Sequence, residues 1–301
     1  MRLLYSVVMI NVATHSGSFH PDEVFAVATL QLFLGDSDLQ IIRTRDESVI
    51  EKADWVIDVG GVYDVETNRF DHHQNGSPMR DNGIPYSSFG LVWKHLGEQI
   101  TGSVEITNFI EEAIAQPVDA GDNGVNLYTL NELKVAPCEM YSVIGSFKPV
   151  WGSDKTEDEA FVEAVDFARG FLERKISFAK ANIEMKQVVQ AGYEAAENKA
   201  LLVFDEPVNR HSFIEYSDVN VIVYPSESSG EQTWRAVVIA TDYHTFSNRA
   251  EFPEAWAGLR DVELAAVSGI EDAVFCHKGR YFFVAHSKEG AIKAAQAVES
   301  R

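Results

Sequence analysis

The sequence Asn68-Arg69-Phe70-Asp71-His72-His73 (residues 68–73) ends a short apolar run with one carboxylate and two adjacent imidazoles. Such groups lose solvation when buried, so three in a row beside a strand suggest a ligand rather than an exposed turn. Adjacent side chains on an extended segment point to opposite sides. We therefore expect His72 to bind a metal ion, His73 to contact a substrate phosphate, and Asp71 to belong to the catalytic machinery.

Three further clusters of acids and histidines lie in the first half of the chain. One is the loop Thr-His-Ser-Gly-Ser-Phe-His-Pro-Asp-Glu at 14–23, where capping of a following helix is the alternative role for the acids. A second is Asp58, which interrupts an apolar stretch and must be paired or metal-bound. A position bridging two ions explains Asp58 better than a salt bridge to an arginine. The third cluster holds Asp119 and Asp122.

These clusters together predict a binuclear metal centre built from strand ends. Carboxylates and imidazoles without a thiolate suit two Mn²⁺ or Mg²⁺ ions better than structural zinc. Within the loop, His20 and Asp22 remain alternatives. Asp122 is slightly favoured over Asp119, because aspartates at a helix end beside glycine are often only turn formers. The predicted metal ligands are His15, His20, Asp22, Asp58, His72, Asp119 and Asp122.

Alternating apolar runs predict an α/β fold. The first half alternates strands at 7–14, 39–43 and 55–59 with helical stretches, which is typical of a largely parallel sheet flanked by helices. In such sheets ligands bind at the carboxyl ends of strands, where the clusters fall. A long helical pattern at 158–198 precedes short strands and a final helix. We expect a metal-binding α/β domain at 1–150, a helical connector at 151–198 and a smaller α+β domain at 199–301.

Composition restricts the partners. The chain has 46 acidic and 25 basic residues, a net charge of −21, and no basic run. Proteins that grip long duplex nucleic acid neutralise its phosphates, so we exclude such a partner and expect a phosphorylated small molecule or short single-stranded RNA. No apolar stretch is long enough for a membrane span. The two cysteines lack a pairing pattern, which favours the cytoplasm. The sequence leaves the oligomeric state open.

Several strings resemble, in order, the Myg (melanocyte proliferating gene) family of metal-dependent hydrolases, itself similar to the wider DHH phosphoesterase superfamily. They are THSGSFHPDE at 14–23, RTRD at 43–46, VIDVGGVYD at 56–64, FDHHQ at 70–74, SSFGLV at 87–92, VDAGDNG at 118–124 and WAGLRD at 256–261. This resemblance implies a DHH-type first domain and a second domain that closes over substrate. Within the superfamily, the relatives that this resemblance implies include RecJ-type exonucleases, oligoribonucleases and manganese pyrophosphatases. Eukaryotic members of the Myg family itself are described as RNA exonucleases.

The sequence thus predicts a two-metal phosphoester hydrolase, in which Asp58, His73 and Asp71 carry out the chemistry on a water activated by the ions. An exonuclease-like phosphodiesterase is preferred. A small-molecule phosphatase or pyrophosphatase and a non-catalytic metal-binding module are the alternatives. Phosphate recognition also needs donors that the acidic first region lacks. The expected substrate-binding residues are His73, Arg260, His286 and Lys288.

Overall fold

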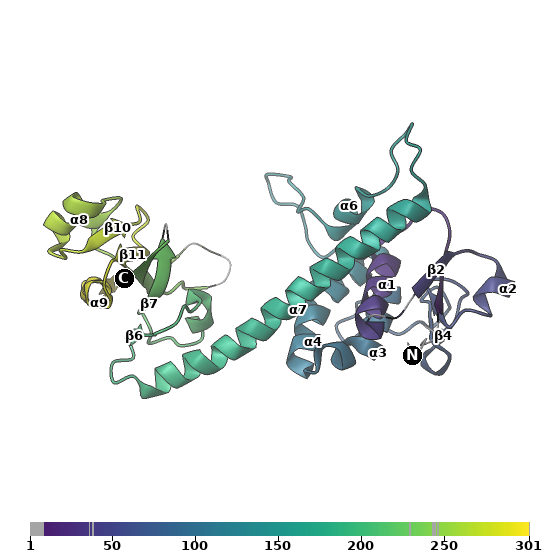
Figure 1. Ribbon diagram of the computed structural model, residues 1–301, viewed down its shortest axis with the longest axis horizontal. Helices are drawn as coiled ribbons and strands as arrows, with labels where there is room; N and C mark the ends of the chain where they lie inside the picture. The colour runs from purple at the N-terminus through teal and green to yellow at the C-terminus, as the bar shows by residue number, and fades with distance from the viewer. Residues whose placement is uncertain are drawn as a thin grey trace, which may run out of the picture. The chain divides into compact units, whose positions relative to one another are not determined.

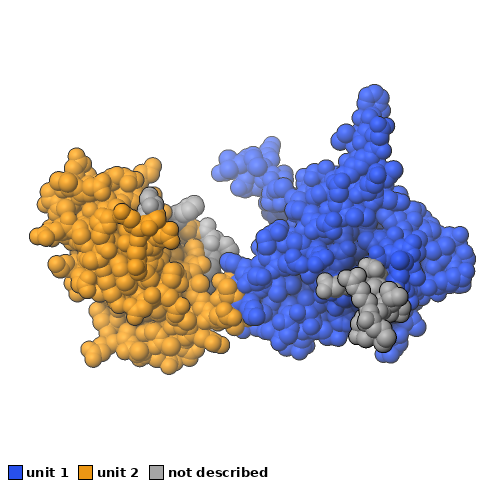
Figure 2. All heavy atoms as spheres, viewed as in Figure 1, with its two compact units in different colours: residues 1–180 blue, residues 181–301 orange. Residues whose placement is uncertain are grey.

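The computed structural model describes residues 9–35, 37, 39–228, 230–242, 245 and 247–300. The chain divides into two compact units, residues 1–180 and 181–301 (Figures 1 and 2). The α/β class predicted from the sequence is confirmed. The division into domains at 1–150, 151–198 and 199–301 stays a prediction. Among the described residues, no helix combines the length and the apolarity needed to cross a membrane.

Unit 1 contains a five-stranded sheet of order β2-β1-β3-β5-β4. Its strands are β1 (Ile10–Thr14), β2 (Leu39–Arg43), β3 (Trp55–Ile57), β4 (Tyr63–Asp64) and β5 (Arg69–Phe70). Strands β2, β1, β3 and β5 run parallel, and only β4 is antiparallel to its neighbour. The carboxyl ends of β1, β3 and β5 therefore meet at one edge of the sheet.

Both faces of this sheet are covered. Val12 and Ile57 point into a large core built with the helices α1 (Pro21–Leu34) and α3 (Ser88–Thr101), whereas Ala13 and Val56 pack on the opposite face near α2 (Glu47–Ile50). After its two acids, Asp22 and Glu23, helix α1 is mostly apolar on all sides, and it is buried over its first ten residues, 21–30. A helix with this composition is stable only inside a core.

A broken helical run follows α3. It consists of α4 (Val104–Ile110), the π-helical turn η2 (Glu111–Ala115) and α5 (Gln116–Asp122). Pro117 lies inside this run and cannot donate a backbone hydrogen bond, which is a common cause of such a widened turn. The helix α6 (Met140–Gly145) comes after a stretch without regular structure. The long helix α7 (Glu157–Ala195) then buries Phe161 and Leu172 in the core of unit 1.

Unit 2 is a second α/β layer structure. Its sheet has the order β10-β11-β8-β7-β6, in which only β6 and β7 are parallel. Helices α8 and α9 cover one face, and the last turns of α7, with Val189, cover the other. The elements are β6 (Leu201–Val203), β7 (Val221–Ser228), β8 (Glu231–Val238), β9 (Ala250–Glu251), α8 (Asp261–Ser268), β10 (Ala273–Cys276), β11 (Phe282–Ala285), α9 (Lys288–Gln296) and β12 (Glu299–Ser300). Short 3₁₀ turns lie at Val65–Thr67, Arg210–Phe213 and Glu254–Trp256.

Candidate metal centre

A pocket of about 990 Å³ in unit 1 collects most of the residues predicted to form a site. The carboxyl ends of the parallel strands supply them: His15 follows β1, Asp58 follows β3, and the segment 71–73 follows β5. This is the position at which open α/β sheets bind ligands. The predicted residues that line it are His15, His20, Asp58, Asp71, His72, His73 and Asp122.

Asp58 occupies the middle of the cluster in an unusual backbone conformation. Its φ is 58°, in the left-handed region that residues other than glycine seldom adopt, and strain of this kind concentrates at functional sites. The strand therefore ends at Ile57, two residues earlier than the sequence predicted. Ser88 Oγ donates a hydrogen bond of 2.9 Å to Asp58 Oδ1, which fixes the carboxylate.

Two histidines approach Asp58 from different sides. His15 Nε2 lies 3.3 Å from Asp58 Oδ2 and 3.0 Å from Glu23 Oε1. His72 Nε2 lies 3.5 Å from Asp58 Oδ1 and 3.1 Å from Asp122 Oδ2. One oxygen of Asp58 thus faces each histidine. The four groups whose ligand atoms lie within 4.8 Å of one another are His15-His20-Glu23, Asp58-His72-His73, His20-Asp22-Asp122 and Asp22-Glu23-Asp58.

Several buried polar atoms of this cluster lack a hydrogen-bond partner among the described residues. They are both carboxylate oxygens of Asp22, Glu23 Oε2 and His72 Nε2, whose neighbours lie at ion-pair distance without hydrogen-bond geometry. Asp22 and Glu23 are fully buried. An unsatisfied buried charged group is strongly unfavourable, whereas a cation would satisfy all of these lone pairs. The donor set therefore fits divalent metal ions.

The pKa values of the cluster also reflect its excess of acidic groups over basic ones. Burial, with the charges of Asp58 and Glu23, raises the pKa of Asp22 well above its usual value. Burial alone would lower the pKa of His15, but Asp58 and Glu23 outweigh it and raise that pKa to about 10. The pKa of His72 also rises to about 10, since Asp122 and Asp58 outweigh its burial. Asp58 shows the reverse balance, because His15 and His72 lower its pKa despite burial.

Asp71 is also buried, but it contacts His73 rather than the other acids of the cluster. Asp71 Oδ1 lies 2.8 Å from His73 Nδ1 and accepts the His73 backbone N–H at 3.0 Å, while its Oδ2 accepts the Gly61 N–H at 2.7 Å. The His73 side chain is 64% exposed in the pocket. The rings of His72 and His73 lie 4.3 Å apart, so the predicted divergence of the two is wrong. The segment 71–73 lies beyond the end of β5, so its successive side chains do not alternate between opposite sides as they would in a strand.

Asp119 lies in a separate buried network. Its Oδ1 accepts hydrogen bonds from Ser87 Oγ at 2.5 Å and from Gly90 N at 3.1 Å, and its Oδ2 lies 2.7 Å from the Arg80 guanidinium. Burial raises the pKa of Asp119 to about 6, although Ser87 and Arg80 oppose the shift. The structure brings Asp122, and not Asp119, to the histidine cluster.

The other three predicted substrate-binding residues belong to unit 2. The Arg260 guanidinium lies 4.2 Å from the ring centroid of Phe275. Lys288 Nζ lies 2.6 Å from Asp205 Oδ1, and His286 is exposed and lines a shallow acidic pocket beside α8. Their role in substrate binding stays a prediction.

Three residues of the site were not assigned a role from the sequence. Glu23 follows Asp22 in the first turn of a helix that is otherwise mostly apolar, and this context was the available signal that Glu23 is buried. Arg45 lines the pocket and belongs to the string at 43–46. Tyr141 also lines the pocket and donates a hydrogen bond of 2.7 Å to Asp122 Oδ1. No local pattern marks Tyr141, because its contact depends on how α6 packs.

Comparisons with known proteins cover nearly the whole chain. A family model named for the MYG1 exonuclease and described as "Uncharacterised protein family (UPF0160)" matches residues 11–298. A MYG1 protein of Dictyostelium discoideum is 32% identical over 319 residues, which cover 95% of each chain. A MYG1 protein of Schizosaccharomyces pombe is 29% identical and covers 96% of this chain and 97% of its own.

Relatives also occur in mammals, and one solved structure aligns over most of the chain. The human MYG1 exonuclease is 29% identical over 326 residues, covering 95% of this chain and 85% of its own. The pGpG-specific phosphodiesterase PggH of Vibrio cholerae aligns over 92% of both chains, with 14% identity and a TM-score of 0.31.

Proposed function

This chain belongs to the MYG1 exonuclease family, and on that premise we propose that it is a divalent-metal-dependent phosphoester hydrolase. Its preferred activity is that of an exonuclease-like phosphodiesterase on short single-stranded RNA or small nucleotides. The mammalian relatives named MYG1 exonuclease support this choice. Its place in the cell is the cytoplasm, which agrees with the two free cysteines, Cys138 and Cys276.

The observation that carries the proposal is the set of buried carboxylates with unsatisfied oxygens around Asp58. Two of the candidate groups, His15-His20-Glu23 and Asp58-His72-His73, share no residue, which supports two ions. In the second group we assign His73 to the substrate phosphate, and Asp122, 3.1 Å from His72 Nε2, takes its place as a ligand. Asp58 directs one oxygen toward each histidine, as expected of a bridging ligand. Manganese and magnesium suit oxygen and imidazole donors. The residues assigned to the ions are His15, His20, Asp22, Glu23, Asp58, His72 and Asp122.

Divalent ions at this cluster would neutralise charge on the phosphoryl group and activate the attacking water. Side chains of the pocket would bind and orient the phosphate. Asp71 Oδ1 holds the Nδ1 side of His73 and so orients the ring. In its imidazolium form, in which both ring nitrogens carry a proton, His73 would donate a hydrogen bond from Nε2 to a phosphoryl oxygen. Arg45, at the wall of the pocket, adds a positive charge that attracts a phosphate.

Charge favours a small substrate over a long one. A net charge of −21 repels extended polyanions, whereas a short nucleotide needs only the local cations of the pocket. We also keep Arg260, His286 and Lys288 as proposed substrate-binding residues. Their basic and imidazole side chains, all in unit 2, can donate hydrogen bonds to a phosphate.

The test is a substrate panel with purified protein and Mn²⁺ or Mg²⁺. The panel contains RNA pentamers, a 5′-phosphorylated dinucleotide, pyrophosphate and a duplex of the same sequence as the RNA. We expect hydrolysis of the RNA and the dinucleotide that requires metal and falls by on the order of 10²-fold or more in Asp58→Asn. Cleavage of pyrophosphate alone would indicate a small-molecule phosphatase instead. Metal binding without hydrolysis of any compound would indicate a non-catalytic metal-binding module.

A further inference from the structure

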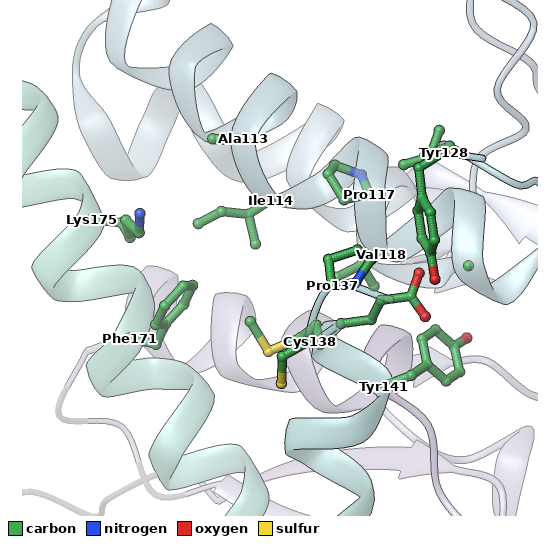
Figure 3. Close-up of a pocket in the computed structure, with 14 residues that line it drawn as sticks. Ala113, Ile114, Pro117, Val118, Tyr128, Pro137, Cys138, Tyr141, Phe171 and Lys175 are labelled. Carbon is green, nitrogen blue, oxygen red and sulfur yellow. The ribbon is translucent and has the colours of Figure 1, made fainter. Parts of the chain in front are cut away.

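A second cavity of unit 1, of about 320 Å³, lies between α5, α6 and α7 (Figure 3). Its volume falls at the lower end of the range of small-molecule sites. Ile114 and Val118 line it from the helical run that contains Pro117, and Phe171 lines it from α7. A segment without helix or strand, residues 123–139, contributes the outer wall, including Tyr128 and Pro137.

The lining has the chemistry of a site for an aromatic ring with an acidic group. Three aromatic side chains, Tyr128, Tyr141 and Phe171, line a cavity whose other walls are mainly aliphatic. Lys175 supplies its only basic side chain. Lys175 Nζ lies 5.6 Å from the ring centroid of Phe171, and no carboxylate of the described residues lies within ion-pair distance of it. In a chain of net charge −21, an unpaired lysine beside an apolar cavity favours an anionic ligand.

The two ends of the cavity differ, so a bound ligand would have one preferred orientation. In Figure 3, Lys175 lies at one end and Tyr141 at the other. The carboxylate of the lining belongs to Glu139, which directly precedes α6 and Tyr141 in the chain. An anionic group is therefore attracted to the Lys175 end, and the ring of the ligand is placed among the aromatic side chains.

Tyr141 joins this cavity to the histidine cluster. Its ring packs so closely on α5 that a Cβ added at Gly121 would lie 2.8 Å from Tyr141 Cε2. Tyr141 and Gly121 line both pockets, and the Tyr141 hydroxyl donates to Asp122 Oδ1 at 2.7 Å. Asp122 Oδ2 in turn lies 3.1 Å from His72 Nε2. A ligand that packs against the Tyr141 ring would therefore alter the hydrogen bond between Tyr141 and Asp122, a carboxylate of the cluster.

We propose that this cavity binds a small aromatic acid, and that occupancy changes the affinity of the cluster for divalent metal through Tyr141. The binding half of this inference is independent of the proposed function. The coupling half rests on metal binding by the cluster and not on hydrolysis.

The binding test uses 2-naphthoate as the probe and its neutral analogue 2-naphthalenemethanol as the chemical control, with calorimetry on the full chain. We expect one saturable site, with the carboxylate bound about tenfold more tightly than the alcohol, and this preference to disappear in Lys175→Gln. Lys180→Gln, on the exposed surface of the same helix, is the matched control and should keep the preference.

A second variant tests the location. Ala113 is exposed and lines the cavity, so Ala113→Phe fills the cavity from its rim without altering the core, while Glu112→Phe adds the same ring outside it. Binding of 2-naphthoate should fall at least tenfold in Ala113→Phe and stay within twofold in Glu112→Phe. Equal binding of both probes to the native chain, or undiminished binding in Ala113→Phe, would overturn the assignment.

The coupling is measured as the dissociation constant of Mn²⁺ with and without saturating 2-naphthoate. We expect a change of fivefold or more in the native chain, and no change in Tyr141→Phe, which keeps the ring in the cavity but lacks the hydroxyl. An unchanged Mn²⁺ affinity in the native chain would overturn the coupling. Because these measurements follow binding, they remain decisive if the substrate panel shows no hydrolysis.

Discussion

Asp58 and His72 face each other across the candidate metal centre, with Asp58 Oδ1 3.5 Å from His72 Nε2. Both side chains are almost fully buried, and each also contacts a further member of the cluster. Asp58 should therefore be essential to metal binding. Replacing it with asparagine keeps the size and tolerates the left-handed backbone, but removes the negative charge.

For Asp58→Asn we expect metal-dependent turnover to fall by on the order of 10²-fold or more, because even partners outside the ligand shell contribute 10–100-fold. The circular dichroism spectrum should stay native. Asp166→Asn, an exposed acid on α7, is the matched control and should retain full activity. Full turnover of Asp58→Asn with Mn²⁺ would show that the cluster is not the site of reaction.

Metal removal should destabilise the fold. A ligand that binds only the native state at 100 times its dissociation constant stabilises it by about 2.7 kcal/mol, or about 5–10 °C in Tm for a unit the size of residues 1–180. We expect Mn²⁺ to raise Tm by this amount after treatment with a chelator, and the increase to disappear in Asp58→Asn. An increase that survives in the variant would place the stabilising ions elsewhere.

The fold and the convergence of the site could be predicted because both follow from local patterns. The apolar runs that precede His15, Asp58 and His72 are too short for helices, and parallel pairing of β1, β3 and β5 brings their carboxyl ends to one edge. His15 and His72 therefore both lie within 3.5 Å of Asp58. The early end of β3 could not be predicted, since the left-handed backbone of Asp58 depends on its contacts in the folded cluster.

Assignments within helices needed tertiary information. Asp119 and Asp122 both belong to α5, and their sequence context is almost the same. Helix α3 packs against α5 so closely at Gly90 that Asp119 is enclosed there, whereas Asp122, at the end of α5, reaches the histidines. Only the packing of α3 distinguishes the two. The same holds for Tyr141, whose role comes from the placement of α6.

The contact between Gly90 and Asp119 predicts a large effect of a small substitution. A Cβ at Gly90 would overlap Asp119 Oδ2 and lie 2.6 Å from an Arg80 nitrogen. Gly90→Ala should therefore lower the free energy of unfolding by about 3 kcal/mol, because it overpacks and separates a buried ion pair. Gly145→Ala is the control, since a Cβ there meets nothing within 4 Å. Urea denaturation of both variants measures the difference, and equal stabilities would contradict the packing described.

Asp119 should also make stability depend on pH. Burial raises its pKa from 3.8 to about 6, so the folded chain binds this proton more tightly than the unfolded chain. The resulting stabilisation is fully present below pH 3.8 and is lost as the pH rises through 6, a change of about 3 kcal/mol. We expect the stability of the native chain relative to Asp119→Asn to fall by about 2.4 kcal/mol of this total between pH 4 and pH 7. A difference that is independent of pH would contradict the shift.

The two cysteines should differ in reactivity. Cys138 is exposed, whereas Cys276 is fully buried, and burial raises the pKa of its thiol to about 11 despite the opposing charge of Arg280. Since the thiolate is the nucleophile, iodoacetamide at pH 8 should modify Cys138 and leave Cys276 intact in the folded chain. Mass spectrometry of the peptides measures this, and Cys138→Ser should abolish rapid labelling. Equal labelling of both thiols would contradict the burial of Cys276.

The central claim is that acids and histidines from separate segments hold divalent cations around Asp58. The most direct measurement is anomalous diffraction from crystals of the chain grown with Mn²⁺. We predict two manganese peaks, one beside His15 and one beside His72, with Asp58 between them. Crystals soaked in millimolar Mn²⁺ that show no peak at this cluster would contradict the account.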